Sequence, residues 1–142
     1  MRGIAQGGFD SALWRELQAL GVPALRVPEA HGGLGLGLLD AAVAAEALGS
    51  GSVPAPFAAV AVMAPAWLQG AASAAQQAEW LPRMASGEMR VAVALDALAC
   101  AAARAPSMSA AALSGQSSGV LDAAGATHGL VLLGDGRTAL VA

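Results

Sequence analysis

The stretch that decides the fold is Leu25-Arg26-Val27-Pro28-Glu29-Ala30-His31-Gly32-Gly33-Leu34-Gly35-Leu36-Gly37. It separates two segments whose apolar residues recur with helical spacing. Pro28 prevents one helix from running through the stretch, because its ring fixes φ and its nitrogen carries no hydrogen. The glycines allow backbone conformations and close approaches that side chains forbid. We therefore predict a loop of fixed shape between two helices.

The glycines of this loop do not have the spacing of a nucleotide-binding fingerprint. The pattern G-x-G-x-x-G, started at Gly33 and Gly35, needs a third glycine where the chain has Leu38. No Gly-Lys-Ser/Thr follows the glycines either. We therefore predict that the loop is structural and binds no nucleotide at residues 32 to 37.

The segment before the loop carries the signals of a helix start and a helix end. Asp10 is a typical N-cap residue, and Phe9 and Trp14 are spaced to pack across it as a hydrophobic staple. Leu17 falls on the same helical face as Trp14, and Gly21 ends the pattern.

After the loop, residues 38 to 48 form a second predicted helix that ends at Gly49. Leu39, Val43 and Ala47 recur on one face of it, and we predict that this stripe is buried.

Two more helices are predicted. Residues 57 to 68 form the third, which we expect to be bent or interrupted near Pro65. Ser73 and Gln76 form a capping box for the fourth, which runs to Leu81, and Pro82 can start a final turn that closes at Gly87. The side chains that we expect to be largely buried in this helical part are Trp14, Leu17, Val43, Phe57 and Trp80.

The period of the apolar residues changes near residue 90. Residues 90 to 95 read Arg-Val-Ala-Val-Ala-Leu, which alternates as a strand does. Residues 97 to 112 are rich in alanine and favour neither a helix nor a strand clearly. Residues 130 to 133 and 138 to 141, joined through Gly134-Asp135-Gly136, predict a β-hairpin.

Composition excludes several classes of function. The 142 residues suit one domain, or one domain and part of another, and the net charge of -3 leaves no basic patch for nucleic acid. Cys100 is the single cysteine, so no internal disulfide and no cysteine-based metal cluster can form.

Residues 47 to 78 carry no charge, but prolines, glycines and glutamines interrupt them, so we predict no membrane span. No signal peptide is visible after Arg2, and we therefore expect a cytoplasmic protein.

The glycine loop resembles a motif of the acyl-CoA dehydrogenase family. Pro28-Glu29, two residues, and Gly32-Gly33-Leu34-Gly35 are similar to that family's Pro-Glu-x-x-Gly-Gly-x-Gly loop, which lies between two helices of its N-terminal domain. Further matches occur in the family's order at Trp14-Arg15-Glu16-Leu17, Leu20-Gly21-Val22-Pro23, Gln77, Trp80-Leu81-Pro82 and Ser86-Gly87-Glu88. The resemblance covers most of residues 9 to 97.

The resemblance implies an α+β fold in two parts. Residues 1–89 correspond to the family's N-terminal all-α helical domain, and residues 90–142 correspond to part of its antiparallel middle β domain. It also implies FAD as the cofactor, acyl-CoA as the ligand, and assembly as a homo- or hetero-oligomer with an acyl-CoA dehydrogenase subunit.

The residues that hold the flavin in the family are replaced here. The family's Thr-Glu-Pro-Gly-x-Gly-Ser becomes residues 95 to 101, in which only Asp96 keeps its chemical character. In its second flavin segment, laid on residues 113 to 122, Ser117 replaces a lysine, Gly119 an aromatic residue and Leu121 a hydroxyl residue. The resemblance leaves only the backbone groups of Ala94 and Leu95 as candidate cofactor contacts.

We assign no catalytic residue and no metal ligand, because no acid of the chain matches the family's catalytic glutamate base and the two histidines have no convincing partners. The resemblance therefore implies a truncated and divergent family member. We expect the isolated chain to be inactive and to purify without FAD. Two alternatives stay open, a non-catalytic subunit of a heteromeric acyl-CoA dehydrogenase and a helical interaction module unrelated to acyl-CoA.

Overall fold

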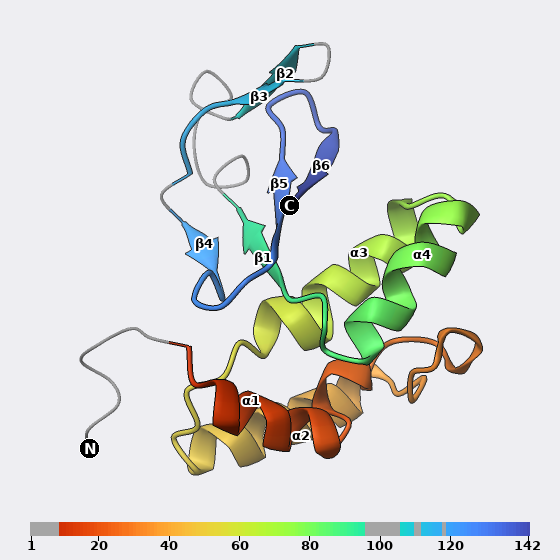
Figure 1. The fold of residues 1–142 in the computed structure, drawn as a ribbon, viewed down its shortest axis with the longest axis vertical. Coiled ribbons are helices and arrows are strands. Elements are labelled where there is room, and N and C mark those ends of the chain that lie inside the picture. The colour runs from red at the N-terminus through yellow and green to blue at the C-terminus, as the bar shows by residue number, and fades with distance from the viewer. Residues whose placement is uncertain (1–8, 96–105, 110–111, 118) are drawn as a thin grey trace.

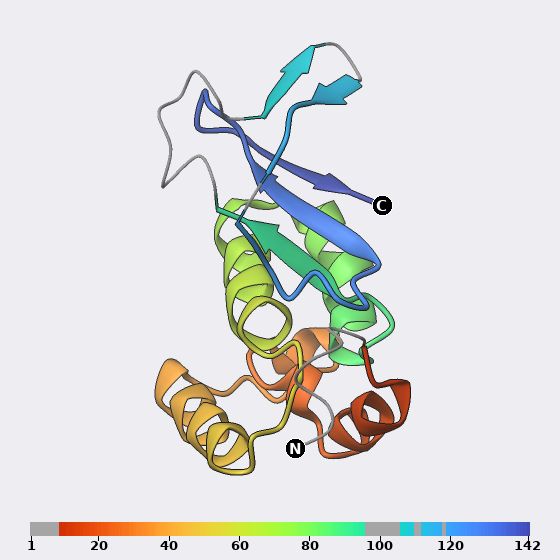
Figure 2. The same cartoon turned by 90° about the vertical axis from the view of Figure 1, so that its left-hand side faces the viewer.

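The computed structural model describes residues 9–95, 106–109, 112–117 and 119–142. The helical elements are α1 (Ser11–Ala19), 3-10 turns at Val22–Ala24 and Glu29–His31, α2 (Leu38–Ser50), a π-helical segment (Ala58–Met63) that continues into α3 (Ala64–Ala71), and α4 (Ala74–Ala85). The strands are β1 (Val91–Ala94), β2 (Ser107–Ser109), β3 (Ala112–Ser114), β4 (Val120–Leu121), β5 (His128–Leu132) and β6 (Thr138–Val141). The sheet packs on α3 and α4, while α1 and α2 lie on the far side of these helices (Figures 1 and 2).

The predicted start of α1 is confirmed. The carboxylate of Asp10 accepts hydrogen bonds of 2.9 and 3.0 Å from two backbone N–H groups of the first turn. The rings of Phe9 and Trp14 lie 6.1 Å apart between centroids, as a hydrophobic staple requires. Trp14 and Leu17 are buried, and the indole N–H of Trp14 donates to the carbonyl of Gly87 at 3.2 Å.

The capping box at the start of α4 is also confirmed, and the turn predicted after Pro82 forms as a continuous part of the same helix. The N–H of Ser73 donates to the side chain of Gln76 at 2.9 Å, and the N–H of Gln76 donates to the Ser73 hydroxyl at 3.3 Å. The helix continues through Pro82 to Ala85. Leu81 and Met84 on either side of the proline are fully buried. Their packing outweighs the cost of the missing N–H.

The interruption predicted near Pro65 takes the form of the π-helical segment. That segment ends at Met63, and Pro65 follows in the first turn of α3, so the change from the π-helix to the α-helix falls next to the proline.

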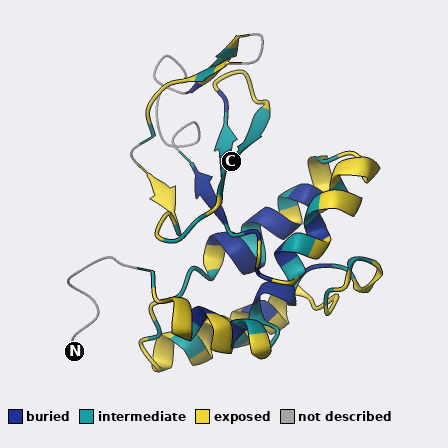
Figure 3. Cartoon of the chain, in the orientation of Figure 1, coloured by how far each residue is buried: buried dark blue, intermediate teal, exposed yellow. Residues whose placement is uncertain are grey.

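The prediction of a buried stripe on α2 is wrong. Leu39 is 78% exposed, Val43 is 61% exposed and Ala47 is exposed, while Ala41 is the one buried residue of the helix (Figure 3). The apolar period predicts the helix correctly, but nothing among the described residues covers this face. Phe57 and Trp80, also expected to be buried, are partly buried.

The glycine loop is held by close backbone contacts. The N–H of Gly35 donates to the carbonyl of Val27 at 2.8 Å, and Gly32 and Gly35 have positive φ. Gly33 does not have positive φ, yet a Cβ built there would overlap the carbonyl group of Val27. The backbone therefore requires glycine at residue 33 because of a close approach.

The sheet is mixed. Its strand order is β4-β1-β5-β6, and β2 and β3 form a separate antiparallel pair. The predicted hairpin is confirmed as the antiparallel pair of β5 and β6. β1 pairs antiparallel with β4 but parallel with β5, which differs from the antiparallel domain that we expected. The chain between β1 and β5 is long enough to return β5 alongside β1 in the same direction.

The main core lies between α3, α4 and the sheet. All four residues of β1 are buried, so both faces of this strand are covered. The fully or almost fully buried side chains of this core include Val27, Leu68, Leu81, Met84, Met89, Val91, Val93 and Leu130. Among the described residues, no helix is long and apolar enough to cross a membrane.

Candidate functional site

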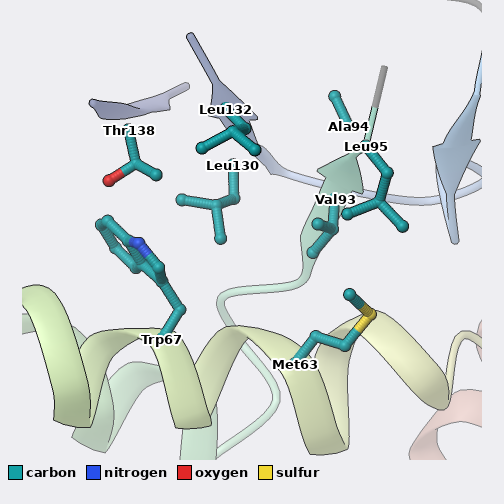
Figure 4. Close-up of a pocket in the computed structure, with 8 residues that line it drawn as sticks. All are labelled: Met63, Trp67, Val93, Ala94, Leu95, Leu130, Leu132 and Thr138. Carbon is teal, nitrogen blue, oxygen red and sulfur yellow. The ribbon is translucent and has the colours of Figure 1, made fainter. Parts of the chain in front are cut away.

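A cavity of about 150 Å³ lies between the helical layer and the sheet (Figure 4). Its lining comes from the π-helical segment, α3, β1, β5 and β6. The lining residues are Met63, Trp67, Val93, Ala94, Leu95, Leu130, Leu132 and Thr138. Several of them are only partly buried, so the cavity reaches the surface of the chain.

The periods of the helix and the strands place these side chains. Met63 and Trp67 are four residues apart, so both point from one helical face toward the sheet. Leu130 and Leu132 are two residues apart on β5 and share the opposing face. Thr138 is the register partner of Leu132 on β6, which brings its hydroxyl to the same end of the cavity.

The cavity is chemically an apolar site. Of the side chains that line it, only Thr138 has a hydroxyl group and only Trp67 has an N–H group, and none is charged. Such a lining can bind an uncharged apolar group and exclude water from it. It offers no general acid or base.

The two candidate cofactor contacts, Ala94 and Leu95, both line this cavity. Their backbone is engaged in the sheet. Ala94 is paired with Val120 and Val131, and the N–H of Leu95 donates to the carbonyl of Gly119 at 3.2 Å. The described residues therefore supply few free partners for the polar edge of a flavin, and they do not fit one on their own. A cofactor contact at Ala94 and Leu95 stays a prediction.

The other predicted flavin-facing positions lie beside β1 or outside the described residues. Leu121 pairs with Val93 through β4 and is 40% exposed, and Gly119 is exposed. Asp96 and the rest of the first replaced motif lie outside the described residues, as does Cys100.

Among the described residues, four titratable groups have shifted pKa values, and none of them lines the cavity. Hydrogen bonds between Asp135 and Arg137 lower the pKa of Asp135 and raise that of Arg137. Burial raises the pKa of the Asp122 carboxyl, which accepts a hydrogen bond from the backbone of Ala59. Burial lowers the pKa of His128, helped by the positive charge of Arg83. Among the described residues, no group of three or more His, Cys, Asp or Glu side chains could hold a metal ion.

A second hollow lies between α2 and the π-helical segment. Its volume is about 240 Å³, and its lining residues are Leu38, Ala41, Ala42, Ala45, Phe57, Ala58, Val62 and Met63. Sequence reasoning missed both hollows. The available signal for this one was the run of alanines in α2, whose small side chains leave space between helices.

The comparisons with known proteins agree with this architecture. The sequence model described as "Acyl-CoA dehydrogenase, N-terminal domain" matches residues 2–88. The chain belongs to the acyl-CoA dehydrogenase family. The resemblance predicted from the glycine loop is thereby confirmed.

Curated relatives match part of the chain. Over 90 residues it is 38% identical to the acyl-CoA dehydrogenase IpdE2 of Mycobacterium tuberculosis, a match that covers 63% of this chain and 27% of the relative. Over 51 residues it is 49% identical to IpdE2 of Mycolicibacterium smegmatis, covering 35% of this chain and 16% of the relative. The matches thus span about a quarter or less of these relatives.

A solved structure matches almost the whole chain. It is described as the Tcur3481-Tcur3483 steroid ACAD G363A variant, and it superposes with a TM-score of 0.73 at 32% identity. The match covers 96% of this chain and 39% of that chain. The predicted α+β class, a helical part followed by a sheet, is therefore confirmed, with the sheet mixed.

Proposed function

We propose that this chain forms one wall of the acyl-binding pocket of an acyl-CoA dehydrogenase. The observation that carries the proposal is the apolar cavity between α3 and β1, whose lining includes the two candidate cofactor contacts, Ala94 and Leu95. Reactions of this family remove hydrogens from Cα and Cβ of an acyl-CoA thioester, and FAD supplies the hydride acceptor. An uncharged cavity suits the hydrocarbon part of such a substrate.

The described residues bind the acyl group and exclude water from it, but they transfer no proton. The reaction needs a base within hydrogen-bond distance of the substrate α proton. No described acidic side chain lines the cavity. We propose that the base and most of the flavin contacts come from polypeptide other than the described residues.

A second candidate is a non-catalytic subunit of a heteromeric enzyme. The exposed leucines and valine of α2 favour it, because an apolar helix face of this kind usually marks a contact with another protein surface. The matching solved structure is itself named for two components. For this chain a partner subunit is a proposal.

Two further features belong to the proposal. The helical unit is placed at residues 1–89 and the sheet unit at residues 90–142, which is supported by the end of α4 at Ala85 and the start of β1 at Val91. The protein is placed in the cytoplasm, where acyl-CoA thioesters are available to it.

The test is acyl-CoA-dependent reduction of an artificial electron acceptor by the purified chain, with FAD added in excess. We expect no turnover and no flavin absorbance from the 142-residue chain alone. Turnover by the chain alone would refute the proposal that this chain supplies a wall of the acyl-binding pocket but no catalytic base. Turnover only after addition of the protein encoded by a neighbouring gene would establish the heteromeric subunit.

If no acyl-CoA binds under either condition, the helical interaction module unrelated to acyl-CoA becomes the better description. Isothermal titration with butanoyl-CoA and with free CoA separates these outcomes. Binding that requires the acyl group supports the pocket wall.

A further inference from the structure

Two polar groups lie at one end of the otherwise apolar cavity. There the side chain of Thr138, on β6, faces the indole of Trp67, on α3 (Figure 4). The two residues belong to opposite walls, one to the sheet and one to the helical layer. They are the only side chains of the lining that carry a nitrogen or an oxygen atom. The cavity is therefore polar at its β6 end and apolar at the end near Met63 and Leu95.

Both polar groups lack a partner in the part of the chain that the structure describes. The indole N–H of Trp67 and the hydroxyl of Thr138 form no hydrogen bond with a described residue. By contrast, the indole N–H of Trp14 donates to the carbonyl of Gly87 at 3.2 Å. Trp67 and Thr138 are only partly buried, so a molecule in the cavity can reach both of their polar atoms.

Thr138 occupies a position on β6 that faces the core. Side chains two residues apart on a strand share a face, and Leu140, two residues further on, packs against the main core. Valine has nearly the same shape as threonine and would make this face entirely apolar. A hydroxyl that loses water without gaining another hydrogen bond costs free energy. Thr138 thus places a hydrogen-bonding group where packing alone favours valine.

The chemistry of this pair selects the group that it can bind. An indole N–H only donates a hydrogen bond, and a threonine hydroxyl donates or accepts one. A carbonyl oxygen has two lone pairs and can accept from both groups. A hydrocarbon that displaced water from the same place would leave both groups unpaired.

The absence of a positive charge from the lining favours a neutral oxygen over a carboxylate. A carboxylate between Trp67 and Thr138 would lose hydration without gaining a counter-charge, because no lining side chain is charged. A charged part elsewhere in the same ligand can stay in water, since the cavity is open to the surface.

We propose that Trp67 and Thr138 form a ketone-binding subsite. The indole N–H and the hydroxyl both donate to one carbonyl oxygen of a ligand whose hydrocarbon part lies along the apolar lining. The subsite depends only on these two side chains and can be measured without acyl-CoA. The identification of the ligand as an acyl group with a keto oxygen on its hydrocarbon part rests on the proposed function.

The experiment compares cyclohexanone with methylenecyclohexane as probes of the 142-residue chain. The two molecules have nearly the same shape, but one carries an oxygen atom where the other carries a CH₂ group. Binding is followed by NMR of the Leu130 and Leu132 methyl groups, which line the cavity in every variant. Both probes should bind saturably to the unaltered chain. The Trp67 indole proton should lie further downfield in the cyclohexanone complex than in the methylenecyclohexane complex, because only the ketone accepts its hydrogen bond.

The quantity to compare between variants is the ratio of the two dissociation constants, because a change in packing affects both probes alike. Thr138→Val and Trp67→Phe each remove one hydrogen-bonding group. Each should reduce the preference for cyclohexanone by about fivefold, as the loss of one hydrogen bond between uncharged groups does. Thr138→Ser keeps the hydroxyl and should keep the preference. Trp80→Phe is the matched control, since Trp80 is also partly buried but does not line the cavity, and it should leave the ratio unchanged.

Three results would overturn the proposal: no saturable binding of either probe, an unchanged ratio in Thr138→Val or in Trp67→Phe, or an equal fall of the ratio in Trp80→Phe. A fourth probe result bears on charge. Cyclohexanecarboxylate should bind more weakly than cyclohexanone, and tighter binding that is lost in Thr138→Val would reveal a site for an anion and reject the ketone.

The outcome is independent of the acyl-CoA assay. A preference for the ketone probe without any acyl-CoA binding would reject the proposed function and keep the subsite. Acyl-dependent binding of acyl-CoA without a preference between the probes would reject the subsite and keep the proposed function.

Discussion

The carboxylate of Asp122 accepts a hydrogen bond of 2.7 Å from the backbone N–H of Ala59, 63 residues earlier in the chain. Ala59 lies in the first turn of the π-helical segment, where backbone N–H groups have no partner within the helix. Asp122 follows β4 and has a positive φ of 56°. One side chain from the sheet thus caps a helix of the other layer and connects the two parts of the molecule.

Replacing Asp122 should weaken that connection. Asp122→Ala removes the acceptor and places alanine at a positive φ, so we expect a loss of about 1.5–3 kcal/mol in the free energy of unfolding. Asp122→Asn keeps an acceptor oxygen and tolerates this backbone conformation, so it should lose clearly less. Urea unfolding followed by circular dichroism measures both. Equal losses for the two variants would show that the hydrogen bond is unimportant.

The same residue predicts a pH dependence of stability. Burial raises the folded-state pKa of Asp122 above its usual value of 3.8, so the folded chain binds a proton more readily than the unfolded chain does. The contribution of Asp122 to stability is therefore present below that value and is lost as the pH rises through the raised pKa.

The comparison that isolates this effect is urea unfolding of the unaltered chain and Asp122→Asn between about pH 3 and 7. The free energy of unfolding of the unaltered chain, minus that of Asp122→Asn, should fall as the pH rises above the usual carboxyl pKa of 3.8. A difference that stays constant or grows over this range would contradict the direction of the shift.

Local signals in the sequence predicted local structure well. Asp10 and the Ser73–Gln76 pair form the predicted caps, because a cap depends on a few neighbouring residues. The hairpin of β5 and β6 was predictable for the same reason. The family followed from the spacing of residues in the glycine loop.

What the sequence did not predict depends on contacts between distant residues. The parallel pairing of Val91 with His128 joins segments that no local pattern connects. The apolar period of α2 predicts a buried face that includes Val43, but a period does not reveal which neighbour, if any, covers that face. The sequence did not predict the cavity beside Trp67, because five separate elements create it.

Gly33→Ala tests whether the glycine loop needs a close backbone approach. The added Cβ would overlap the Val27 carbonyl group, so we expect a loss of about 1–3 kcal/mol in the free energy of unfolding. Gly49→Ala is the matched control, since a Cβ at this helical position meets no atom within 4 Å. It should raise stability by about 0.4–1 kcal/mol. Thermal and urea unfolding measure both variants.

The prediction that the glycine loop is structural and binds no nucleotide has a separate test. NAD and ATP should show no saturable binding to the unaltered chain. If either nucleotide binds and Gly33→Ala abolishes that binding while the chain remains folded, the loop is a nucleotide site and the assignment is wrong.

The uncovered face of α2 predicts self-association of the isolated chain. Leu39 and Val43 lie one turn apart, and both are largely exposed. Exposed apolar side chains that are grouped in this way favour contacts with other apolar surfaces. The double variant Leu39→Glu, Val43→Glu should therefore shift the sedimentation profile toward the monomer. Its free energy of unfolding should change by no more than about 0.5 kcal/mol, as for other surface substitutions.

Ala41→Glu tests the opposite face of the same helix, where Ala41 is 1% exposed, and it should destabilise the fold. A double variant that associates as strongly as the unaltered chain would show that another surface drives the contact.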